Sequence, residues 1–248
     1  MPSLSATIIA HNEARNLSRV IRSLACADEL IVIDSESTDD TATVARSLGA
    51  TVITHPFEGF AAQKNFATSQ ARHDWILSLD ADEELNQAAR QAVEQWKAST
   101  PAASGYRFAR RARYLGRWIR HSGWYPDYKL RLFDRRRGQW QGAYVHESVV
   151  VEGRVETLPG EILHYTCESL QEHRERIEFY TDLAAREMFD HGKRVSALGR
   201  WLAPPWIFLE TYLLRGGILD GREGFLISRM AARYVNRKFA KLRLLRSS

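Results

Sequence analysis

The sequence predicts an α/β fold in which a mostly parallel sheet is flanked by helices, followed by a mixed β extension and a helical, amphipathic C-terminal region. The first observation is that short apolar runs alternate with segments of helical periodicity, which is typical of βαβ units. The second is that several runs end on polar clusters, and in α/β folds ligands bind at that edge of the sheet. The expected strands are residues 5–10, 30–33, 51–54 and 75–79.

Helices are expected between these strands because apolar residues recur at helical spacing after each run. Leu17 and Ile21 follow the first strand, and Asn12 is placed to cap their helix. The second helix is expected to end at Gly49, and the third to cover residues 60–71. A fourth helix with one buried face is expected after the last strand.

Composition divides the chain into three segments. Residues 1–100 hold 8 Lys and Arg against 14 Asp and Glu, whereas the remaining residues hold 27 against 16. The acidic part would repel a phosphate unless a metal intervened, while the basic part could meet nucleic acid, an anionic membrane or a phosphorylated acceptor. We expect a βα half over 1–100, a mixed β half of the same domain over 101–168, and a helical region over 169–248.

The cysteines and the apolar segments indicate the cell compartment in which the protein is expected. Cys26 and Cys167 have no CxxC spacing, which excludes a disulfide framework and a zinc site of the usual spacing. The amino terminus lacks the pattern of an export signal, and no apolar stretch approaches the about 18 residues of a membrane span. We therefore expect a protein of the cytoplasm.

Two carboxylates, Asp80 and Asp82, follow the fourth expected strand. Such a pair at the edge of a sheet can share a divalent cation that neutralises a diphosphate. The alternative is that Asp82 to Glu84 place negative charge in the first turn of the next helix, where its dipole favours them. Three strand ends converge on polar clusters, which predicts one site. The other polar residues at strand ends are Asn12, Glu13 and Asp34.

Residues 101–140 combine basic and aromatic side chains, with 11 Lys and Arg against 2 acids. This texture can indicate stacking on nucleic-acid bases, or a sugar platform on which arginines hold phosphates. A third interpretation, for Arg135 to Arg137, is an exposed hairpin. The β-like runs expected in this half are residues 106–109, 128–133, 145–151 and 162–165.

The C-terminal region carries an apolar, aromatic stretch broken by prolines over 201–209. A basic amphipathic helix follows over 222–246, with 8 Lys and Arg against one acid. This combination is typical of an anchor on an anionic membrane surface, here the inner face of the cell membrane. The alternative is a helix that packs on the core and exposes a basic face.

Four short motifs occur in order along the first half of the chain. They are Thr7 to Glu13, residues 32–41, Gln63-Lys64-Asn65, and residues 79–83. Together they resemble the inverting family 2 glycosyltransferases of GT-A fold, whose sheet is Rossmann-like. Later segments further resemble the branch that adds β-1,4-linked glucose to a heptose of the lipopolysaccharide inner core. These segments are residues 124–127, 129–133, 145–147, 164–165 and 219–221.

The resemblance implies a nucleotide-sugar donor, best UDP-glucose, a lipid-linked or lipopolysaccharide-core acceptor, and Mg²⁺ or Mn²⁺ as cofactor. Lys64 matches a basic position near the diphosphate or the uracil, although a plain surface lysine on a helix is the alternative. The implied donor-binding residues are Asn12, Glu13, Asp34, Lys64 and Asp80. The implied metal ligands are Asp82, Asp80 and His146, with His164 as a substitute for the histidine.

Inverting transfer needs a carboxylate that accepts the proton of the acceptor hydroxyl. Many family 2 enzymes place this base in a Glu-Asp or Asp-Glu pair after the sheet, and this sequence has none there. Glu147 is the first candidate for the base and Asp127 the second. We assign acceptor binding to Trp124, Tyr125 and Arg131.

Three other functions compete with this interpretation. A polyprenyl phosphate acceptor would need little or no protein base. A nucleotidyltransferase would need a glycine-rich loop after the first strand, and His11 to Arg15 contain no glycine. A nucleic-acid-binding module would leave Asp34, Asp80 and Asp82 without a role, so we expect no nucleic-acid partner.

Overall fold

The chain folds into two compact units in a computed structural model that describes residues 1–142 and 147–247. Unit 1 comprises Met1–Arg110 and Asp127–His164. Unit 2 comprises Arg111–Pro126 and Tyr165–Ser248. Each unit has its own hydrophobic core.

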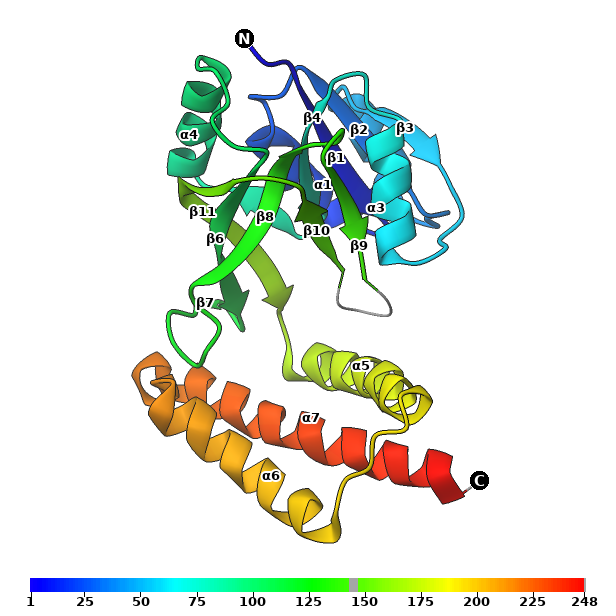
Figure 1. Ribbon diagram of the computed structural model, residues 1–248, viewed down its shortest axis with the longest axis vertical. Coiled ribbons are helices and arrows are strands. Elements are labelled where there is room, and N and C mark those ends of the chain that lie inside the picture. The colour runs from blue at the N-terminus through cyan, green and yellow to red at the C-terminus, as the bar shows by residue number, and fades with distance from the viewer. Residues whose placement is uncertain (143–146, 248) are drawn as a thin grey trace. The chain divides into compact units, whose positions relative to one another are not determined.

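The sheet of unit 1 has a parallel side and an antiparallel side (Figure 1). The order of its main path is β3-β2-β1-β4-β8-β6-β11-β5. The parallel strands are β1 (Leu4–Ala10), β2 (Glu29–Asp34), β3 (Thr51–Thr54) and β4 (Trp75–Asp80). The strands on the antiparallel side are β5 (Glu83–Leu85), β6 (Gly105–Tyr114), β8 (Asp127–Asp134) and β11 (Val155–Cys167). The predicted α/β class with a mixed β extension is confirmed.

The register of the parallel strands brings the predicted polar residues to one edge of the sheet. Ala10, the last residue of β1, pairs with Asp34 of β2. Ile9 pairs with Asp80 of β4. Because parallel strands share a direction, Asp34, Asp80 and the residues after Ala10 all lie at the carboxyl edge, as the sequence predicts.

Helices cover both faces of the sheet, because successive side chains of a strand point to opposite faces. Val32 packs with Leu17 of α1, whereas Ile31 and Ile33 pack with Ala67 of α3. Figure 1 shows α1 behind the strands and α3 in front of them. The helices of unit 1 are α1 (Ala14–Ser23), α2 (Thr41–Ser47), α3 (Phe60–Ser69) and α4 (Gln87–Lys97).

The predicted helix cap at Asn12 is wrong. The helix α1 begins after Glu13, and Asn12 has a φ of 55°. Its side-chain oxygen instead accepts a hydrogen bond from the Thr38 N–H at 2.8 Å. Asn12 therefore joins the loops after β1 and β2. Its positive φ is a backbone conformation that asparagine adopts more readily than most residues.

The segment after the paired carboxylates is a strand and not the first turn of a helix. β5 (Glu83–Leu85) pairs antiparallel with β11, and α4 begins later, at Gln87. The side chain of Asn86 caps α4 by accepting the Ala89 N–H at 2.9 Å. The alternative in which Glu83 stabilises a helix dipole is therefore wrong, because Glu83 lies in a ladder and its side chain is buried.

Two short strands complete unit 1. β9 (Gly138–Gln141) and β10 (Ser148–Val151) pair antiparallel. Asn65 of α3 holds this ladder, donating to the Trp140 carbonyl and accepting the Trp140 N–H, both at 2.9 Å. Glu147 precedes β10 directly, so the contact positions this candidate base relative to α3.

Unit 2 is mainly helical. α7 packs against both α5 and α6. Its core joins Leu226 and Ile227 of α7 to Tyr114, Ile119 and Cys167. α6 continues through two prolines, so the predicted break over 201–209 is wrong. The elements of unit 2 are β7 (Arg117–Trp118), which pairs with the end of β6, α5 (Leu170–Asp190), α6 (Ala197–Leu209), the π-turn η1 (Glu210–Leu214), the 3₁₀ turn η2 (Gly217–Asp220) and α7 (Gly221–Ser247).

Among the residues that the structure describes, no helix combines the length and the apolar character needed to cross a membrane.

Candidate active site

The loops at the carboxyl edge of the parallel strands are tied to one another. The Asn12 N–H donates to Ser37 Oγ at 2.9 Å, and the Glu13 N–H donates to Thr41 Oγ1 at 2.8 Å. Asp34 is 4% exposed, and its Oδ1 has no hydrogen-bond donor within residues 1–142 and 147–247. Buried polar atoms are seldom left unpaired, so Asp34 Oδ1 is available to a ligand donor such as a hydroxyl or an imide N–H.

Lys64 lies between two of the predicted site residues. Its Nζ is 2.7 Å from Asp80 Oδ1 and 2.9 Å from Glu147 Oε1, and it lies 4.4 Å from the centre of the Trp140 ring. Lys64 is buried, with 2% of its side chain exposed. The alternative of a plain surface lysine is therefore wrong. The Lys64 side chain thus bridges Glu147, the first candidate base, and Asp80, the first carboxylate of the Asp80 and Asp82 pair.

A second cation, Arg131, continues the contacts from Asp80. Arg131 Nη2 donates to Asp80 Oδ2 at 2.7 Å and to Glu83 Oε1 at 2.8 Å. Arg110 then joins Glu83 Oε1, at 3.1 Å, to Asp127 Oδ2, at 2.7 Å. Both candidate bases thus lie at the ends of one series of contacts, which we name the ion-pair chain. In order, its members are Glu147, Lys64, Asp80, Arg131, Glu83, Arg110 and Asp127.

The ion-pair chain keeps Asp80 ionised although it is largely buried. Burial alone would raise the pKa of the Asp80 carboxyl, but the charges of Arg131 and Lys64 outweigh burial and hold this pKa well below its ordinary value. For Arg131, burial alone would lower the pKa, whereas Asp80 and Glu83 raise it above the ordinary value. Charges in a protein interior persist only with such partners.

The two candidate bases differ in their electrostatic surroundings. Burial would raise the pKa of Asp127, but Arg110 and Lys129 together hold that pKa below its ordinary value. A carboxylate with a lowered pKa is a weak proton acceptor near neutral pH. Glu147 shares its contacting cation, Lys64, with Asp80. The choice between Glu147 and Asp127 as the base stays a prediction.

Asp82 pairs with a histidine from the neighbouring strand. Asp82 Oδ2 is 3.3 Å from His164 Nε2, and His164 stands opposite Glu83 in the ladder of β11 and β5. Two donors of one metal ion at about 2.1 Å lie about 3 Å apart, so this spacing suits a shared ion. Among the described residues no group of three His, Cys, Asp or Glu side chains is assembled to hold a metal. His146 lies outside the described residues.

An incomplete set of protein ligands fits a divalent ion that arrives with a diphosphate. Mg²⁺ is usually bound by one or two carboxylates together with substrate phosphates and water. Both oxygens of Asp80 contact cationic side chains, whereas Asp82 contacts the imidazole of His164. A neutral imidazole can itself bind a metal ion. The oxygen and nitrogen donors of Asp82 and His164 thus fit the predicted cofactor, and their role as its ligands stays a prediction.

Comparison with known proteins decides the class of this site. Residues 5–150 match the family described as glycosyl transferase family 2. The chain belongs to glycosyl transferase family 2. This confirms the family that the four motifs resemble.

Relatives of this family 2 glycosyltransferase match along nearly the whole chain. The lipopolysaccharide core biosynthesis glycosyltransferase LpsC of Rhizobium meliloti is 32% identical over 246 residues, which cover 96% of this chain and 91% of LpsC. The uncharacterized glycosyltransferase RT0209 of Rickettsia typhi is 31% identical over 255 residues, which cover 98% of this chain and 87% of RT0209.

A solved structure shares the fold. The mannosyltransferase PcManGT of Pyrobaculum calidifontis, solved with GDP-Man and Mn²⁺, superposes with a TM-score of 0.57 at 15% identity. The superposition covers 97% of this chain and 87% of PcManGT. The predicted GT-A architecture of this family 2 glycosyltransferase is confirmed.

The three predicted acceptor residues lie in different surroundings. Trp124 and Tyr125 belong to unit 2, where the Trp124 ring packs edge-on against Tyr114 with centroids 5.6 Å apart. Arg131 belongs to unit 1 and is buried in the ion-pair chain. Acceptor binding by these three residues stays a prediction.

Sequence reasoning missed two members of the ion-pair chain in this family 2 glycosyltransferase, Glu83 and Arg110. Glu83 is buried between Arg131 and Arg110, and its Oε2 also accepts the Asp80 N–H at 3.2 Å. The alternation of Glu83 and Leu85 around Glu84 is the signal that could have indicated a strand with a buried carboxylate. Arg110 gave no such signal, because it is one of many arginines in its segment.

Proposed function

We propose that this family 2 glycosyltransferase transfers a sugar with inversion, best glucose from UDP-glucose, to a heptose of a lipopolysaccharide core. The observation that carries the proposal is the ion-pair chain, which fixes ionised Asp80 at the sheet edge, two residues before the Asp82 that pairs with His164. The 96% coverage of this chain by LpsC supports the class of acceptor.

Donor binding is assigned to the carboxyl edge of the parallel strands. Asp34 Oδ1 would accept a hydrogen bond from the ribose or the base, which satisfies a buried oxygen that has no donor among the described residues. Asn12 and Glu13 would shape the same pocket, because their loop is bonded to the loop after β2. Lys64 would carry the positive charge nearest to the diphosphate.

Asp82 and His164 would hold Mg²⁺ or Mn²⁺, with Asp80 and His146 as further ligands. When bound, the ion acts as a Lewis acid that stabilises negative charge on the departing diphosphate. Arg131 and Lys64 hold Asp80 in one orientation from both of its oxygens. These two cations therefore position the carboxylate pair relative to the sheet edge before the donor arrives.

Glu147 would act as the base. The acceptor oxygen forms a bond to the anomeric carbon, the bond from that carbon to the diphosphate oxygen breaks, and the hydroxyl proton passes to Glu147. Lys64 contacts Glu147 Oε1 at 2.9 Å and so fixes this carboxylate, whose Oε2 would receive the proton. Since the pKa of Asp127 is lowered, Asp127 is the weaker candidate.

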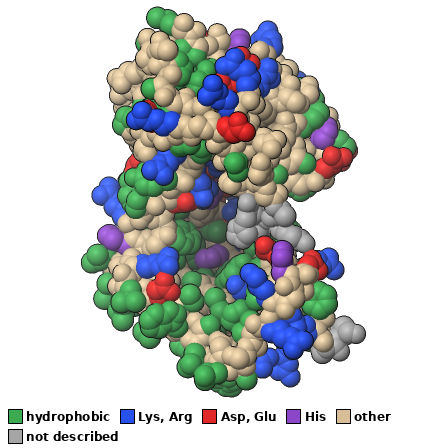
Figure 2. All heavy atoms as spheres, viewed as in Figure 1, with side chains coloured by type: hydrophobic (Ala, Val, Ile, Leu, Met, Phe, Trp, Pro, Cys, Tyr) green, Lys and Arg blue, Asp and Glu red, His purple; other side chains and the backbone are tan. Residues whose placement is uncertain are grey.

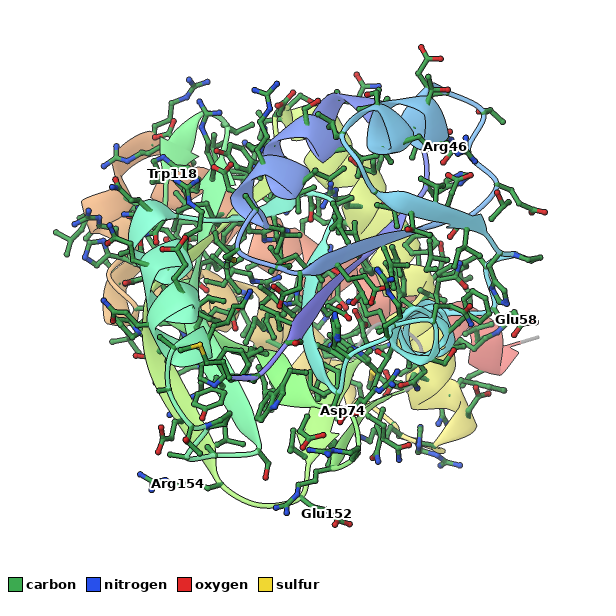
Figure 3. The ribbon with its side chains drawn as sticks, turned by 90° about the horizontal axis from the view of Figure 1, so that it is seen from above. Arg46, Glu58, Asp74, Trp118, Glu152 and Arg154 are labelled. Atoms are coloured by element: carbon green, nitrogen blue, oxygen red, sulfur yellow. The ribbon has the colours of Figure 1, made fainter. Side chains whose placement is uncertain are left out.

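The test is the release of UDP or GDP from a panel of nucleotide sugars, with Mg²⁺, with Mn²⁺ and with chelator. We expect metal-dependent hydrolysis of one donor, lost in Asp82→Asn. Asp74→Asn is the matched control, because Asp74 is an exposed carboxylate before β4 (Figure 3). Hydrolysis of no donor, or equal rates for both variants, would contradict the proposal. A Glu147→Gln variant with unchanged transfer to added acceptor would favour a polyprenyl phosphate instead.

We also propose that unit 2 docks on an anionic membrane surface through α6, η1 and η2. Hydrophobic side chains gather over the α6 side of this unit (Figure 2). Trp201 is 81% exposed and Leu214 is 72% exposed. Large exposed apolar patches on soluble chains mark interaction sites. The other exposed apolar residues of this surface are Leu198, Leu202, Trp206, Leu209, Leu213, Ile218 and Leu219.

The surface differs from the one that the sequence favoured. The apolar side chains of α7 face inward, with Ile227 and Met230 buried, and Arg237 of α7 pairs with Glu178 of α5. α7 thus fits the alternative of a packed helix with a basic face. α6 carries the exposed tryptophans, which suit the interface between headgroups and acyl chains. The lipid surface is favoured over a protein partner because Arg200, Arg215 and Arg222 lie within or beside the same segment.

The membrane proposal is tested by cosedimentation with vesicles that contain anionic phosphatidylglycerol or only phosphatidylcholine. We expect binding to the anionic vesicles, at least tenfold weaker in the double variant Trp201→Ser/Trp206→Ser. Phe57→Ser, which removes an exposed aromatic side chain from unit 1, is the control. Unchanged binding of the double variant would contradict the proposal. A change from dimer to monomer in the double variant would assign this surface to a second copy of the chain.

A further inference from the structure

A pocket of about 560 Å³ in unit 1 is lined by four arginines. Arg15, Arg19 and Arg22 lie on α1 at spacings of four and three residues, which places them on one face of the helix. Arg90 of α4 lies across from them. The single acidic side chain in the described lining is Glu84, so the pocket carries a large excess of positive charge.

Arg19 has two polar neighbours, Glu84 in the lining and Asn16 on α1. Arg19 Nε lies 3.9 Å from Glu84 Oε2, and Arg19 Nη2 donates to Asn16 Oδ1 at 2.7 Å. In the described lining, four guanidinium groups accompany one carboxylate, and like charges on one wall repel one another. The arrangement favours an anionic ligand, because such a ligand would relieve that repulsion.

The pocket is distinct from the ion-pair chain although the same strands bear both. On β5 the Glu83 side chain joins the ion-pair chain, while the next side chain, Glu84, lines the pocket. On β11 His164 contacts Asp82, while Leu163 lines the pocket. Since Glu84 pairs with Leu163 and Glu83 pairs with His164, the side chains of Glu84 and Leu163 lie on the face of this ladder opposite to Glu83 and His164.

We propose that the arginine pocket binds a phosphate group carried by the acceptor saccharide, which rests on the proposed transferase function. Guanidinium groups bind phosphate through paired N–H donors, and several of them converge here. The volume is in the range of pockets for small molecules, which leaves room for a sugar beside the phosphate. Ser18, Asn86 and Gln87 add polar groups suited to its hydroxyls.

The position of the pocket suits an acceptor of more than one sugar. β5 is the last strand of the sheet order, so no further strand of that path covers its outer side among the described residues. A saccharide could pass around this edge from Asp82 to the pocket. The phosphate would then anchor the acceptor at a point remote from the reacting hydroxyl, and it would contribute to acceptor binding without contacting the donor.

The first test is calorimetric titration of pyrophosphate into metal-free protein at low ionic strength. We expect the double variant Arg22→Gln/Arg90→Gln to bind pyrophosphate at least tenfold more weakly than the parent chain. Arg154→Gln is the matched control, because Arg154 is 73% exposed and lies outside the pocket lining (Figure 3). Equal affinity of the parent chain and the double variant would overturn the proposal.

Hydrolysis of the nucleotide sugar separates a failure of the pocket from a failure of the transferase function. Weaker pyrophosphate binding with unchanged donor hydrolysis is the expected result for Arg22→Gln/Arg90→Gln. If the parent chain hydrolyses the donor but the double variant binds pyrophosphate as tightly as the parent chain, the pocket proposal is overturned and the transferase function stands. Absence of donor hydrolysis in the parent chain would overturn the assignment to an acceptor, even if pyrophosphate affinity fell.

A vesicle arm distinguishes an acceptor phosphate from a lipid headgroup. The parent chain and Arg22→Gln/Arg90→Gln are compared for binding to vesicles that contain phosphatidylglycerol. Equal vesicle binding supports the saccharide phosphate as the ligand. A tenfold loss of vesicle binding in the double variant would assign the pocket to lipid headgroups and overturn the proposal.

Discussion

In unit 1 charged side chains lie in the interior, whereas in unit 2 apolar side chains lie on the surface. Lys64, Glu83 and Arg131 are buried beneath the sheet edge, joined by ion pairs. Trp201 and Leu214 are exposed on α6 and η1. Each unit departs from the usual distribution, in which apolar groups are buried and charges are solvated.

The two departures indicate different kinds of interaction. A buried charge has a desolvation cost that its partners must offset, so a buried ion-pair chain is retained where it positions chemical groups. An exposed apolar surface has no such internal partner and lowers its free energy only when something covers it. This contrast underlies our proposals that unit 1 carries out the reaction and that unit 2 docks on a membrane surface.

The largest expected effect on stability is that of Lys64→Met. This change removes the buried cation that Asp80 and Glu147 share, so Glu147 loses its contact with Lys64 and Asp80 keeps Arg131. We expect a loss of about 3–5 kcal/mol in the free energy of unfolding, measured by urea denaturation. Lys129→Met is the control, since Lys129 is an exposed partner of Asp127, and it should change stability by less than about 0.5 kcal/mol. If Lys64→Met lost as little unfolding free energy as Lys129→Met, the buried charges of unit 1 would not have the role that distinguishes this unit from unit 2.

The next effect compares a buried with an exposed apolar residue of unit 2. Met230→Ala should lower the free energy of unfolding by about 2–5 kcal/mol, because the side chain of Met230, on α7, is buried. Trp201→Ala removes a larger side chain, yet it should change stability by less than about 0.5 kcal/mol while it weakens vesicle binding. Thermal or urea unfolding of both variants provides the comparison. A strong loss of stability in Trp201→Ala would mean that α6 is packed rather than exposed.

A smaller effect is the pH dependence of stability that His173 of unit 2 produces. Burial, together with the charge of Arg176, lowers the pKa of His173 to about 4, and His173 Nδ1 lies 2.8 Å from the Tyr114 hydroxyl. The native state then holds His173 neutral, whereas the unfolded chain binds a proton below about pH 6.5. The contribution of neutral His173 to the free energy of unfolding is therefore fully present above pH 6.5. It falls as the pH drops toward 4, by about 2 kcal/mol at pH 5.

The measurement for His173 is urea unfolding followed by far-ultraviolet circular dichroism at pH 7 and pH 5. His173→Gln should flatten the pH dependence by the expected amount. His191→Gln, at an exposed histidine after α5, should leave the dependence unchanged. The same slope in all three proteins would show that His173 is not the titrating group.

Much of the fold follows from local patterns. The four parallel strands and the helices between them were predictable because apolar periodicity and polar strand ends are local properties of the chain. The same patterns brought Asp34, Asp80 and Asp82 to one edge. β5 was missed because three residues give little periodicity, and Glu-Glu after a strand is also typical of a first helical turn.

The remaining features depend on contacts between distant residues. Lys64 is buried because it meets Glu147, 83 residues later in the chain, and no local pattern records that contact. Likewise, the sequence indicates that α6 and α7 both carry apolar residues, but only the packing of α7 between α5 and α6 leaves α6 exposed. Asn12 was misassigned because helix α1 begins one residue beyond Glu13 rather than directly after Asn12.

The most direct test of the role of unit 1 is the binding of Mn²⁺ in the presence of UDP, followed by electron paramagnetic resonance. We expect the parent chain and Asp74→Asn to bind Mn²⁺ with equal affinity, and Asp82→Asn to bind it at least tenfold more weakly. This result would place the ion beside the Asp82–His164 pair, next to the ion-pair chain. Equal affinity in Asp82→Asn would contradict the assignment of the carboxylate pair as the metal-binding and donor-binding centre.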